Sequence, residues 1–191
     1  MSSYTSISPD KLARLIGTAK TPVIIDVRTD EDFAADQRLI PGAVRRNHQE
    51  AADWGNQFAG RPAIVACLRG QKLAEGTAAW LRHANVLAET LEGGFEGWKA
   101  AKLPLVPASK LPARDAQGRT VWVTRARPKI DRIACPWLIR RFVDPAAVFL
   151  FVAPAEVADV ADRFGATPFD IEHVFWSHRT LHGEEACTFD V

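Results

Sequence analysis

The amino-acid sequence predicts an α/β fold with a mainly parallel sheet. Three short apolar stretches rich in β-branched residues, 23–27, 62–67 and 86–91, have the composition of buried strands. Longer stretches between and after them carry helical patterns of apolar residues. Because strands that alternate with helices usually pair in parallel, this order of elements indicates an α/β architecture.

The segments around these strands carry the signals of helix starts and turns. Ser8 followed by Pro9 predicts a capped helix, since proline suits the first helical position. Thr29 is expected to cap a short helix over 30–36. The other expected elements are a turn at 40–43, a strand near Val44, helices over 48–58 and 95–101, and a helix over 72–83 with Leu73, Thr77, Trp80 and Leu81 on its apolar face.

A proline-rich, polar stretch over 103–118 predicts a boundary between two domains. We place the first domain at 1–107, a linker at 108–118, and a second, smaller α/β or α+β unit at 119–191. In the second unit the pattern predicts strands over 120–124 and 148–152 and helices over 136–142 and 154–164. Residues 167–191 give no assignment.

The composition is that of an ordinary soluble protein. Of 191 residues, 47% are hydrophobic and 25% are charged, and the net charge is +1, so nucleic acid is not an expected partner. We find no signal peptide and no apolar run near the roughly 20 residues that cross a bilayer, so no membrane association is expected. Three widely spaced cysteines suit a reducing cytoplasm. The oligomeric state stays open.

Cys67 lies where a predicted strand turns into the helix over 72–83. Such a loop turns backbone N–H groups inward, and the following helix adds its positive end, so a thiolate or a persulfide anion is stabilised there. Gly70 permits the tight curve, and Arg69 and Lys72 supply positive charge for an anionic sulfur donor. The alternative is that Cys67 packs as a small apolar side chain, the commoner role of a single cysteine.

Four landmarks occur in order along the first domain: Asp26-Val27-Arg28, Ile40-Pro41-Gly42-Ala43, the loop Cys67-Leu68-Arg69-Gly70-Gln71-Lys72, and Leu91-Glu92-Gly93-Gly94-Phe95-Glu96-Gly97-Trp98. With them the chain resembles the rhodanese-like family over about residues 5–107. The resemblance implies a doubly wound parallel sheet with helices on both faces. It also implies a sulfurtransferase whose Cys67 alternates between thiol and persulfide and requires no cofactor. It assigns donor binding to Leu68, Arg69, Gly70, Gln71 and Lys72, and structural support to Asp26 and Arg28.

Two positions depart from the pattern of that family. Lys72 ends the loop where many members have Arg, and lysine is a point charge rather than a bidentate fork. Leu39 stands where His is common. Both differences concern donor specificity more than sulfur transfer. Phosphatases of similar fold need an Arg six residues after the Cys, where this chain has Leu73, so phosphatase chemistry is disfavoured.

The second unit begins with a local excess of six positive charges between Arg119 and Arg141. These guanidinium groups could hold an oxyanion. Alternatively, they form a solvated face or pair with acids such as Asp144 and Asp170. The aromatic residues of this unit are interpreted as core side chains: Trp122, Trp137, Trp176, Phe142, Phe149 and Phe151.

Three segments accompany the basic run: Phe169-Asp170-Ile171, Ser177-His178-Arg179 and Cys187-Thr188-Phe189-Asp190. Together with 121–142, they resemble the C-terminal domain of ChrB-type chromate-resistance proteins over about residues 119–191. The resemblance implies a link to chromate or to other metal and oxyanion stress. In that family the domain can follow a DNA-binding region, which a rhodanese-like domain replaces here, so DNA binding is not carried over. Because the family's domain continues further, a truncated second domain is expected.

The second unit also contains soft and borderline metal ligands. The candidates are Cys135, His178 and Cys187, accompanied by Asp170, His173 and His182. None forms a Cys-x-x-Cys or His-Glu-x-x-His pair, so a metal site stays a hypothesis. If Pro136 is the first helical residue, Cys135 is the N-cap and its thiol pKa is lowered.

Two functions therefore stay open. The first is a cytoplasmic sulfurtransferase that passes sulfane sulfur through a Cys67 persulfide, from thiosulfate or a persulfide donor to a thiol or other nucleophile. The second is a non-catalytic sensor-regulator, in which the first domain supplies a reactive thiol and the second recognises chromate or a metal ion.

Overall fold

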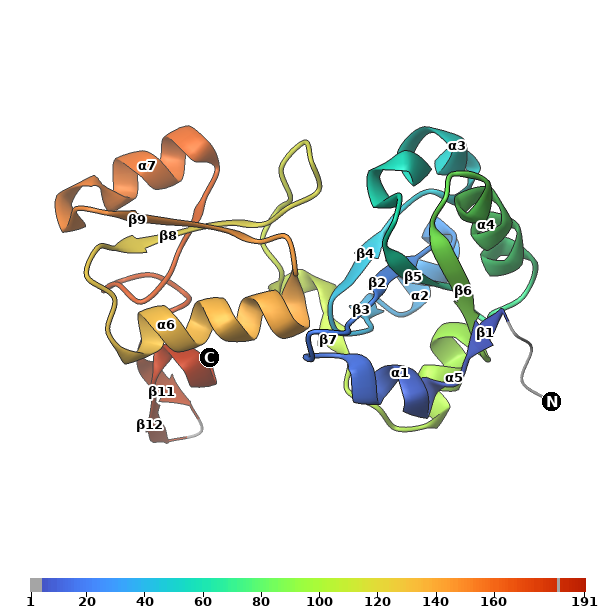
Figure 1. Ribbon diagram of the computed structural model, residues 1–191. Helices are drawn as coiled ribbons and strands as arrows, with labels where there is room; N and C mark the ends of the chain where they lie inside the picture. The colour runs from blue at the N-terminus through green and yellow to red at the C-terminus, as the bar shows by residue number, and fades with distance from the viewer. Residues whose placement is uncertain (1–4, 182) are drawn as a thin grey trace. The chain divides into compact units, whose positions relative to one another are not determined.

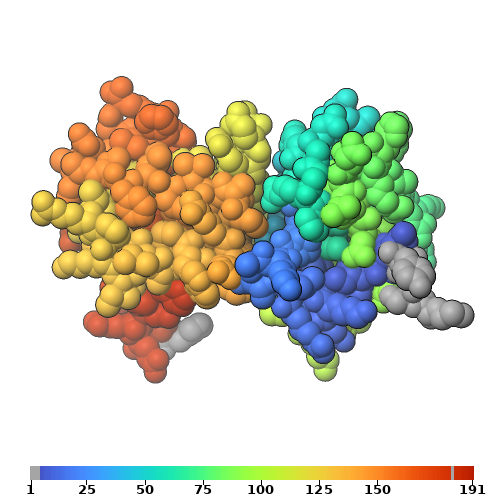
Figure 2. Space-filling model, viewed as in Figure 1, coloured from blue at the N-terminus to red at the C-terminus, as the bar shows by residue number. Residues whose placement is uncertain are grey.

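The computed structural model describes residues 5–181 and 183–191, so His182 lies outside the described residues. The chain divides into two compact units, Met1–Lys110 and Leu111–Val191. Blue to green atoms largely make up the first unit and yellow to red atoms the second (Figure 2). Within the described ranges, no helix is both long enough and apolar enough to cross a membrane.

The first unit is built on a five-stranded sheet in the order β1-β6-β5-β2-β4, and all of its pairings are parallel. Its strands are β1 (Ser6–Ile7), β6 (Leu87–Leu91), β5 (Pro62–Ala66), β2 (Val23–Asp26) and β4 (Ala43–Arg45). The central strands β5 and β2 are the apolar, β-branched stretches of the sequence. The predicted parallel α/β sheet is therefore confirmed.

Helices cover both faces of this sheet, because neighbouring residues of a strand point to opposite sides. Ile25 and Val65 share one core cluster with Trp54 of α3 and with Ala74 and Leu81 of α4. Figure 1 shows α3 and α4 on this side of the strands and α1 and α5 on the other. The helices are α1 (Pro9–Leu15), α2 (Asp30–Ala35), α3 (Ala51–Trp54), α4 (Lys72–His83) and α5 (Gly94–Ala100).

The predicted helix starts are confirmed, but one helix face is not. Ser8 Oγ accepts a hydrogen bond from the Lys11 amide, and Thr29 Oγ1 accepts one from the Asp32 amide. In α4 the predicted bounds hold, yet Trp80 is 55% exposed. The buried face consists of Ala74, Thr77, Ala78 and Leu81. Their spacing of three and four residues is that of one helical stripe, and small alanines form it where the large tryptophan was expected.

After α5 the chain returns along the first unit. Here β7 (Val106–Pro107) pairs antiparallel with β3 (Arg38–Leu39), and a 3-10 turn over Ala108–Lys110 follows. The proline-rich stretch thus begins as part of the first unit. It contributes an edge pairing before the chain enters the second unit.

The second unit is a smaller α/β unit with a three-stranded parallel sheet in the order β10-β8-β9. Trp122 of β8 packs with Cys135 and Ile139 on one face, and Val123 packs with Val157 on the other. The strands are β8 (Val121–Arg125), β9 (Val148–Val152), β10 (Thr167–Pro168) and the hairpin strands β11 (Arg179–Leu181) and β12 (Glu184–Ala186). The helices are α6 (Ile130–Leu138), a π-helical segment Ile139–Val143, a 3-10 turn Pro154–Glu156, α7 (Val157–Phe164) and a 3-10 turn Thr188–Asp190.

Two sequence-based expectations for this unit are wrong. The helix expected from Pro136 begins at Ile130, so Pro136 lies inside α6, where its ring removes one backbone donor, and the helix continues as a π-helical segment. Asp131 in the first turn favours the earlier start by its charge. Trp137 and Phe151, expected in the core, are 51% and 42% exposed.

Candidate active site

Cys67 is the first residue after the central strand β5, at the carboxyl end of the sheet. Its side chain is buried, with 5% exposure, and it borders the core cluster of the first unit. The thiol Sγ lies 3.8 Å from the carbonyl oxygen of Gln71, so the loop folds back over the sulfur. A polar loop and an apolar core therefore meet at this side chain.

The first two carbonyl groups of the loop are bonded to amides of α5. The Phe95 amide donates to Cys67 O at 2.9 Å, and the Glu96 amide donates to Leu68 O at 3.0 Å. In a trans peptide, the N–H and the C=O point in opposite directions. The amides of Leu68 and Arg69 therefore face away from α5. Within the described part of the chain, no protein group accepts a hydrogen bond from the amides of residues 68–71.

Two glycines allow the Cys67 loop to pack directly against the start of α5. Gly70 has φ +68°, and a Cβ there would lie 2.2 Å from Leu91 O. Gly94 has φ +58°, and a Cβ there would lie 2.3 Å from both Cys67 O and Gly70 N. At these positions the backbone of the Cys67 loop packs directly against the backbone at the end of β6 and the start of α5. Gly93-Gly94 is part of a family landmark in the sequence, but its contact with the cysteine loop was not predicted.

Substituting Gly94 with alanine should destabilise the first unit by at least about 2 kcal/mol, because the positive φ and the missing space both oppose a side chain. Urea unfolding measures the change. Gly76→Ala is the matched control, since Gly76 lies inside α4 with open space around it. This control should gain about 1 kcal/mol. Equal stability of Gly94→Ala and the unchanged chain would contradict the packing described.

The residues expected to bind the donor differ in how far they are exposed to solvent. Leu68 and Gly70 are half-buried, whereas Arg69, Gln71 and Lys72 are exposed. A pocket of about 550 Å³ lies beside the loop, and Arg69, Gly70 and Gln71 line it together with Arg82 and Glu92. Cys67 and Lys72 are not among its lining residues. The loop thus presents mobile cations to solvent while the thiol stays underneath.

Asp26 and Arg28 form a buried ion pair, with Arg28 Nη2 2.6 Å from Asp26 Oδ2. The same guanidinium donates to Asp36 O and to Arg38 O, and it lies 3.8 Å from the centre of the Phe95 ring. Arg28 therefore connects the end of β2, the end of α2 and β3 with the helix that holds the Cys67 loop. Among the described residues, no hydrogen bond or ion pair joins Asp26 or Arg28 to Cys67.

At the far side of this network, Arg38 donates to both carboxylate oxygens of Asp36, at 2.7 and 2.6 Å. Mainly through these hydrogen bonds, the pKa of Asp36 is lowered from 3.8 to about 2. Ionised Asp36 thus stabilises the fold above its ordinary pKa of 3.8, and this contribution is lost as the pH falls toward 2.

NMR titration of the Asp36 carboxyl group should give a midpoint near pH 2 that returns toward 3.8 in Arg38→Ala. An unchanged midpoint in that variant would refute the assignment.

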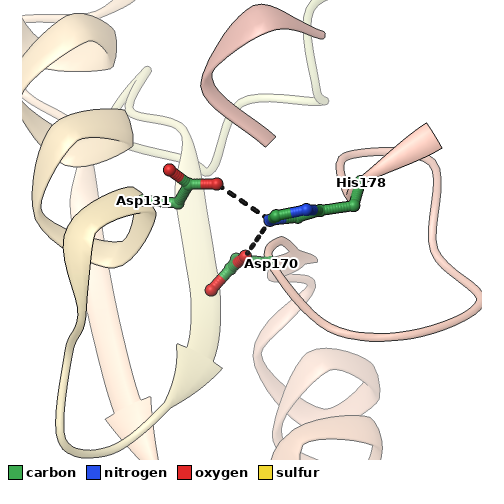
Figure 3. A group of neighbouring side chains, drawn as sticks. All are labelled: Asp131, Asp170 and His178. Carbon is green, nitrogen blue, oxygen red and sulfur yellow. Dashed lines mark ion pairs between the residues drawn. The ribbon is translucent and has the colours of Figure 1, made fainter. Parts of the chain in front are cut away.

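Among the metal-ligand candidates of the second unit, the structure brings His178 and Asp170 together with Asp131 (Figure 3). Asp131 was not among the candidates, because its place in the sequence does not show that it lies near Asp170 and His178. Cys187 instead donates to Asp190 Oδ2 at 3.1 Å, which raises the pKa of its thiol. His173 is exposed and does not belong to the group.

Cys135 differs from the expectation in both position and chemistry. It lies inside α6 rather than at an N-cap, and it is 6% exposed. Burial raises the pKa of its thiol to about 12, and the negative charge of Asp131, one turn earlier, adds to the increase. The expected lowering of this pKa is therefore wrong, because the side chain packs in the core formed with Trp122 and Ile139.

The basic run is partly neutralised within its own unit. Arg132 Nε lies 3.4 Å from Asp170 Oδ2, and Arg119 pairs with Asp115. Asp144 pairs with Arg114, which precedes the run, and it also accepts from the Thr120 amide and hydroxyl. Asp170 therefore pairs with an arginine of the basic run, as expected. The arginine that pairs with Asp144 is Arg114, which lies outside the run.

A five-stranded parallel sheet, covered by helices and bearing one cysteine in a short loop after its central strand, defines the first unit as a rhodanese-like domain. Residues 8–101 match the family profile of the rhodanese-like domain, and residues 122–191 match that of the ChrB C-terminal domain. The chain belongs to the rhodanese-like family and carries a ChrB C-terminal domain after the rhodanese-like one.

Individual relatives match one unit each. Thiosulfate sulfurtransferase GlpE of Actinobacillus succinogenes is 31% identical over 110 residues, which are 56% of this chain and 94% of that protein. Protein ChrB of Cupriavidus metallidurans is 42% identical over 74 residues, which are 37% of this chain and only 21% of that protein. A solved rhodanese-like domain protein from Staphylococcus aureus is 28% identical with a TM-score of 0.44, covering 49% of this chain and 90% of that one.

Proposed function

We propose that this protein is a sulfurtransferase that carries sulfane sulfur on Cys67 as a persulfide. The observation that carries the proposal is the loop after β5, in which Cys67 O and Leu68 O accept from amides of α5 while the amides of residues 68–71 have no acceptor in the described part of the chain. Free backbone donors beside a sulfur atom stabilise its anion. The match to a thiosulfate sulfurtransferase over the first unit supports the same function.

The reaction follows from the charges of this loop. The Cys67 thiolate attacks the outer sulfur of thiosulfate, the sulfur–sulfur bond of the donor breaks, and sulfite leaves with the bonding electron pair. Arg69 and Lys72, both exposed, attract the anionic donor. The loop amides then hold the negative terminal sulfur of the persulfide. An acceptor thiolate attacks that sulfur, and Cys67 leaves as the thiolate.

Persulfide formation can be tested directly on the full chain. Incubation with thiosulfate should add the mass of one sulfur atom to the intact protein, and cyanide should remove it as thiocyanate. Cys67→Ala should show no gain, whereas Cys187→Ala should behave like the unchanged protein. A chain that gains no sulfur from thiosulfate or from a small persulfide would refute the proposal.

The free cysteines fit a reducing compartment, so we place this chemistry in the cytoplasm, with no resident cofactor.

A second candidate function, a chromate-responsive or metal-responsive regulator, is favoured by an observation in the ChrB C-terminal domain. Arg125 Nε and Arg132 Nε are buried and have no hydrogen-bond acceptor among the described residues, and both side chains lie beside Asp170. Unsatisfied guanidinium donors suit an oxyanion. Titration of the Cys67→Ala chain with chromate tests this function, and an unchanged tryptophan fluorescence at millimolar chromate would count against it.

A further inference from the structure

Three side chains from separate parts of the second unit converge in Figure 3. Asp131 lies in the first turn of α6, Asp170 follows β10, and His178 precedes β11. His178 Nε2 is 3.0 Å from Asp131 Oδ2 and 3.6 Å from Asp170 Oδ1, and the three donor atoms all lie within 4.8 Å of one another. His178 is 65% exposed, so ions in solvent can reach the group.

The two spacings from His178 are those of neighbouring ligands around one metal ion. Bonds of about 2.1 Å to nitrogen and oxygen place neighbouring ligands about 3.0 Å apart in octahedral coordination and about 3.4 Å apart in tetrahedral coordination. The two distances from His178, 3.0 and 3.6 Å, fall close to these values. Two carboxylates and one imidazole also carry the charge that a divalent ion neutralises. An imidazole in the set favours Zn²⁺, Fe²⁺ or Ni²⁺ over Mg²⁺ and Ca²⁺.

Surrounding groups hold both carboxylates in place. The Thr188 amide donates to Asp131 Oδ2 at 3.1 Å, and the Thr188 hydroxyl donates to Asp170 Oδ1 at 2.9 Å. Such contacts orient metal-binding carboxylates. Arg132 is 7% exposed and lies 3.4 Å from Asp170 Oδ2, yet its Nε has no hydrogen-bond acceptor among the described residues. A buried donor beside the group thus lacks an acceptor, which an oxygen ligand on a bound ion would supply.

We propose that Asp131, Asp170 and His178 bind a divalent first-row transition-metal ion, with Zn²⁺ as the reference ion, and leave coordination positions open to solvent. Cys135 and Cys187 are not part of the ligand set, since Cys135 packs in the core and Cys187 bonds Asp190. The proposal is independent of the chemistry of Cys67. The competing arrangement is a His178 that pairs directly with the two carboxylates without a metal.

Equilibrium dialysis of the full chain against Zn²⁺ separates the two arrangements. A Cys67→Ala background removes the reactive thiol as a competing ligand. We expect about one ion per chain, and affinity lowered by at least about 10-fold in His178→Ala and in Asp131→Asn. His173→Asn is the matched control, because His173 is an exposed histidine of the same unit with φ +65°, which asparagine accepts. This control should bind Zn²⁺ like the parent.

Two further measurements keep the test decisive. Zn²⁺ should raise the melting temperature of the parent and of His173→Asn but not of His178→Ala. Co²⁺ should give visible absorption without an intense thiolate-to-cobalt band, because no cysteine is a ligand. Equal Zn²⁺ binding by the parent and His178→Ala would contradict the proposed site. An intense thiolate-to-cobalt band in the Co²⁺ spectrum would contradict it as well. His178 is exposed, so its alanine variant should fold, which circular dichroism without metal can verify.

Discussion

Replacing Cys67 with alanine should lower the rate of sulfur transfer from thiosulfate to cyanide by at least about 1,000-fold. The reason is that the proposed cycle has no step without a covalent bond to this sulfur. In the proposed cycle, neighbouring loop residues bind the donor but cannot carry the transferred atom. The measurement is thiocyanate production under steady-state conditions, with the protein at equal concentration in both assays.

Two other cysteines allow this result to be interpreted. Cys187→Ala should retain the full rate, since Cys187 lies in the other unit and bonds Asp190. Cys135 is unsuitable as a control because it is a core residue. Cys67→Ala should remain folded, as judged by circular dichroism, because alanine fits the space of a small buried side chain. A Cys67→Ala protein that kept more than a tenth of the rate would exclude the proposed role of this residue.

Replacing Arg28 with methionine should destabilise the first unit by about 3–5 kcal/mol, because it leaves the buried Asp26 carboxylate without its partner. The side chain of Arg28 is fully buried, and its guanidinium also satisfies the carbonyls of Asp36 and Arg38. Methionine fills part of the space but donates to none of these oxygens. Hydrogen exchange of the amides in β2 and β5 reports the stability of this unit alone.

The matched control for this effect is another arginine–aspartate pair of the same unit. Arg38 pairs with Asp36, but its side chain is 46% exposed. Removing it should therefore cost less than the loss expected for Arg28→Met, because water and salt screen an exposed pair. Comparable losses in Arg28→Met and Arg38→Ala would show that burial does not control the strength of these pairs, contrary to the argument above.

The first unit could be predicted well from local sequence signals. Apolar, β-branched stretches identified the strands, and Ser8 and Thr29 identified two helix starts, because capping needs only neighbouring residues. The exposed Trp80 could not be foreseen in this way. Which face of α4 is buried depends on the sheet beneath it, and small alanines fit that surface closely.

Prediction was weaker where contacts join distant segments. Pro136 was interpreted as a helix start, although it lies inside α6, and Asp131 was not among the candidate ligands. The meeting of Asp131 with Asp170 and His178 depends on how α6 packs against the end of β10, which no local spacing records. The contact between Gly70 and Gly94 was hidden for the same reason.

The dependence of the cysteine loop on α5 has a consequence for biosynthesis. Cys67 O and Leu68 O find their donors, Phe95 and Glu96, only on a segment made later, and β1 pairs with β6, which is also made late. A nascent chain that has left the ribosome only as far as α4 therefore has its cysteine and most of the sheet core, but no finished loop around the sulfur. The loop around Cys67 is therefore completed only after the residues up to Glu96 have left the ribosome.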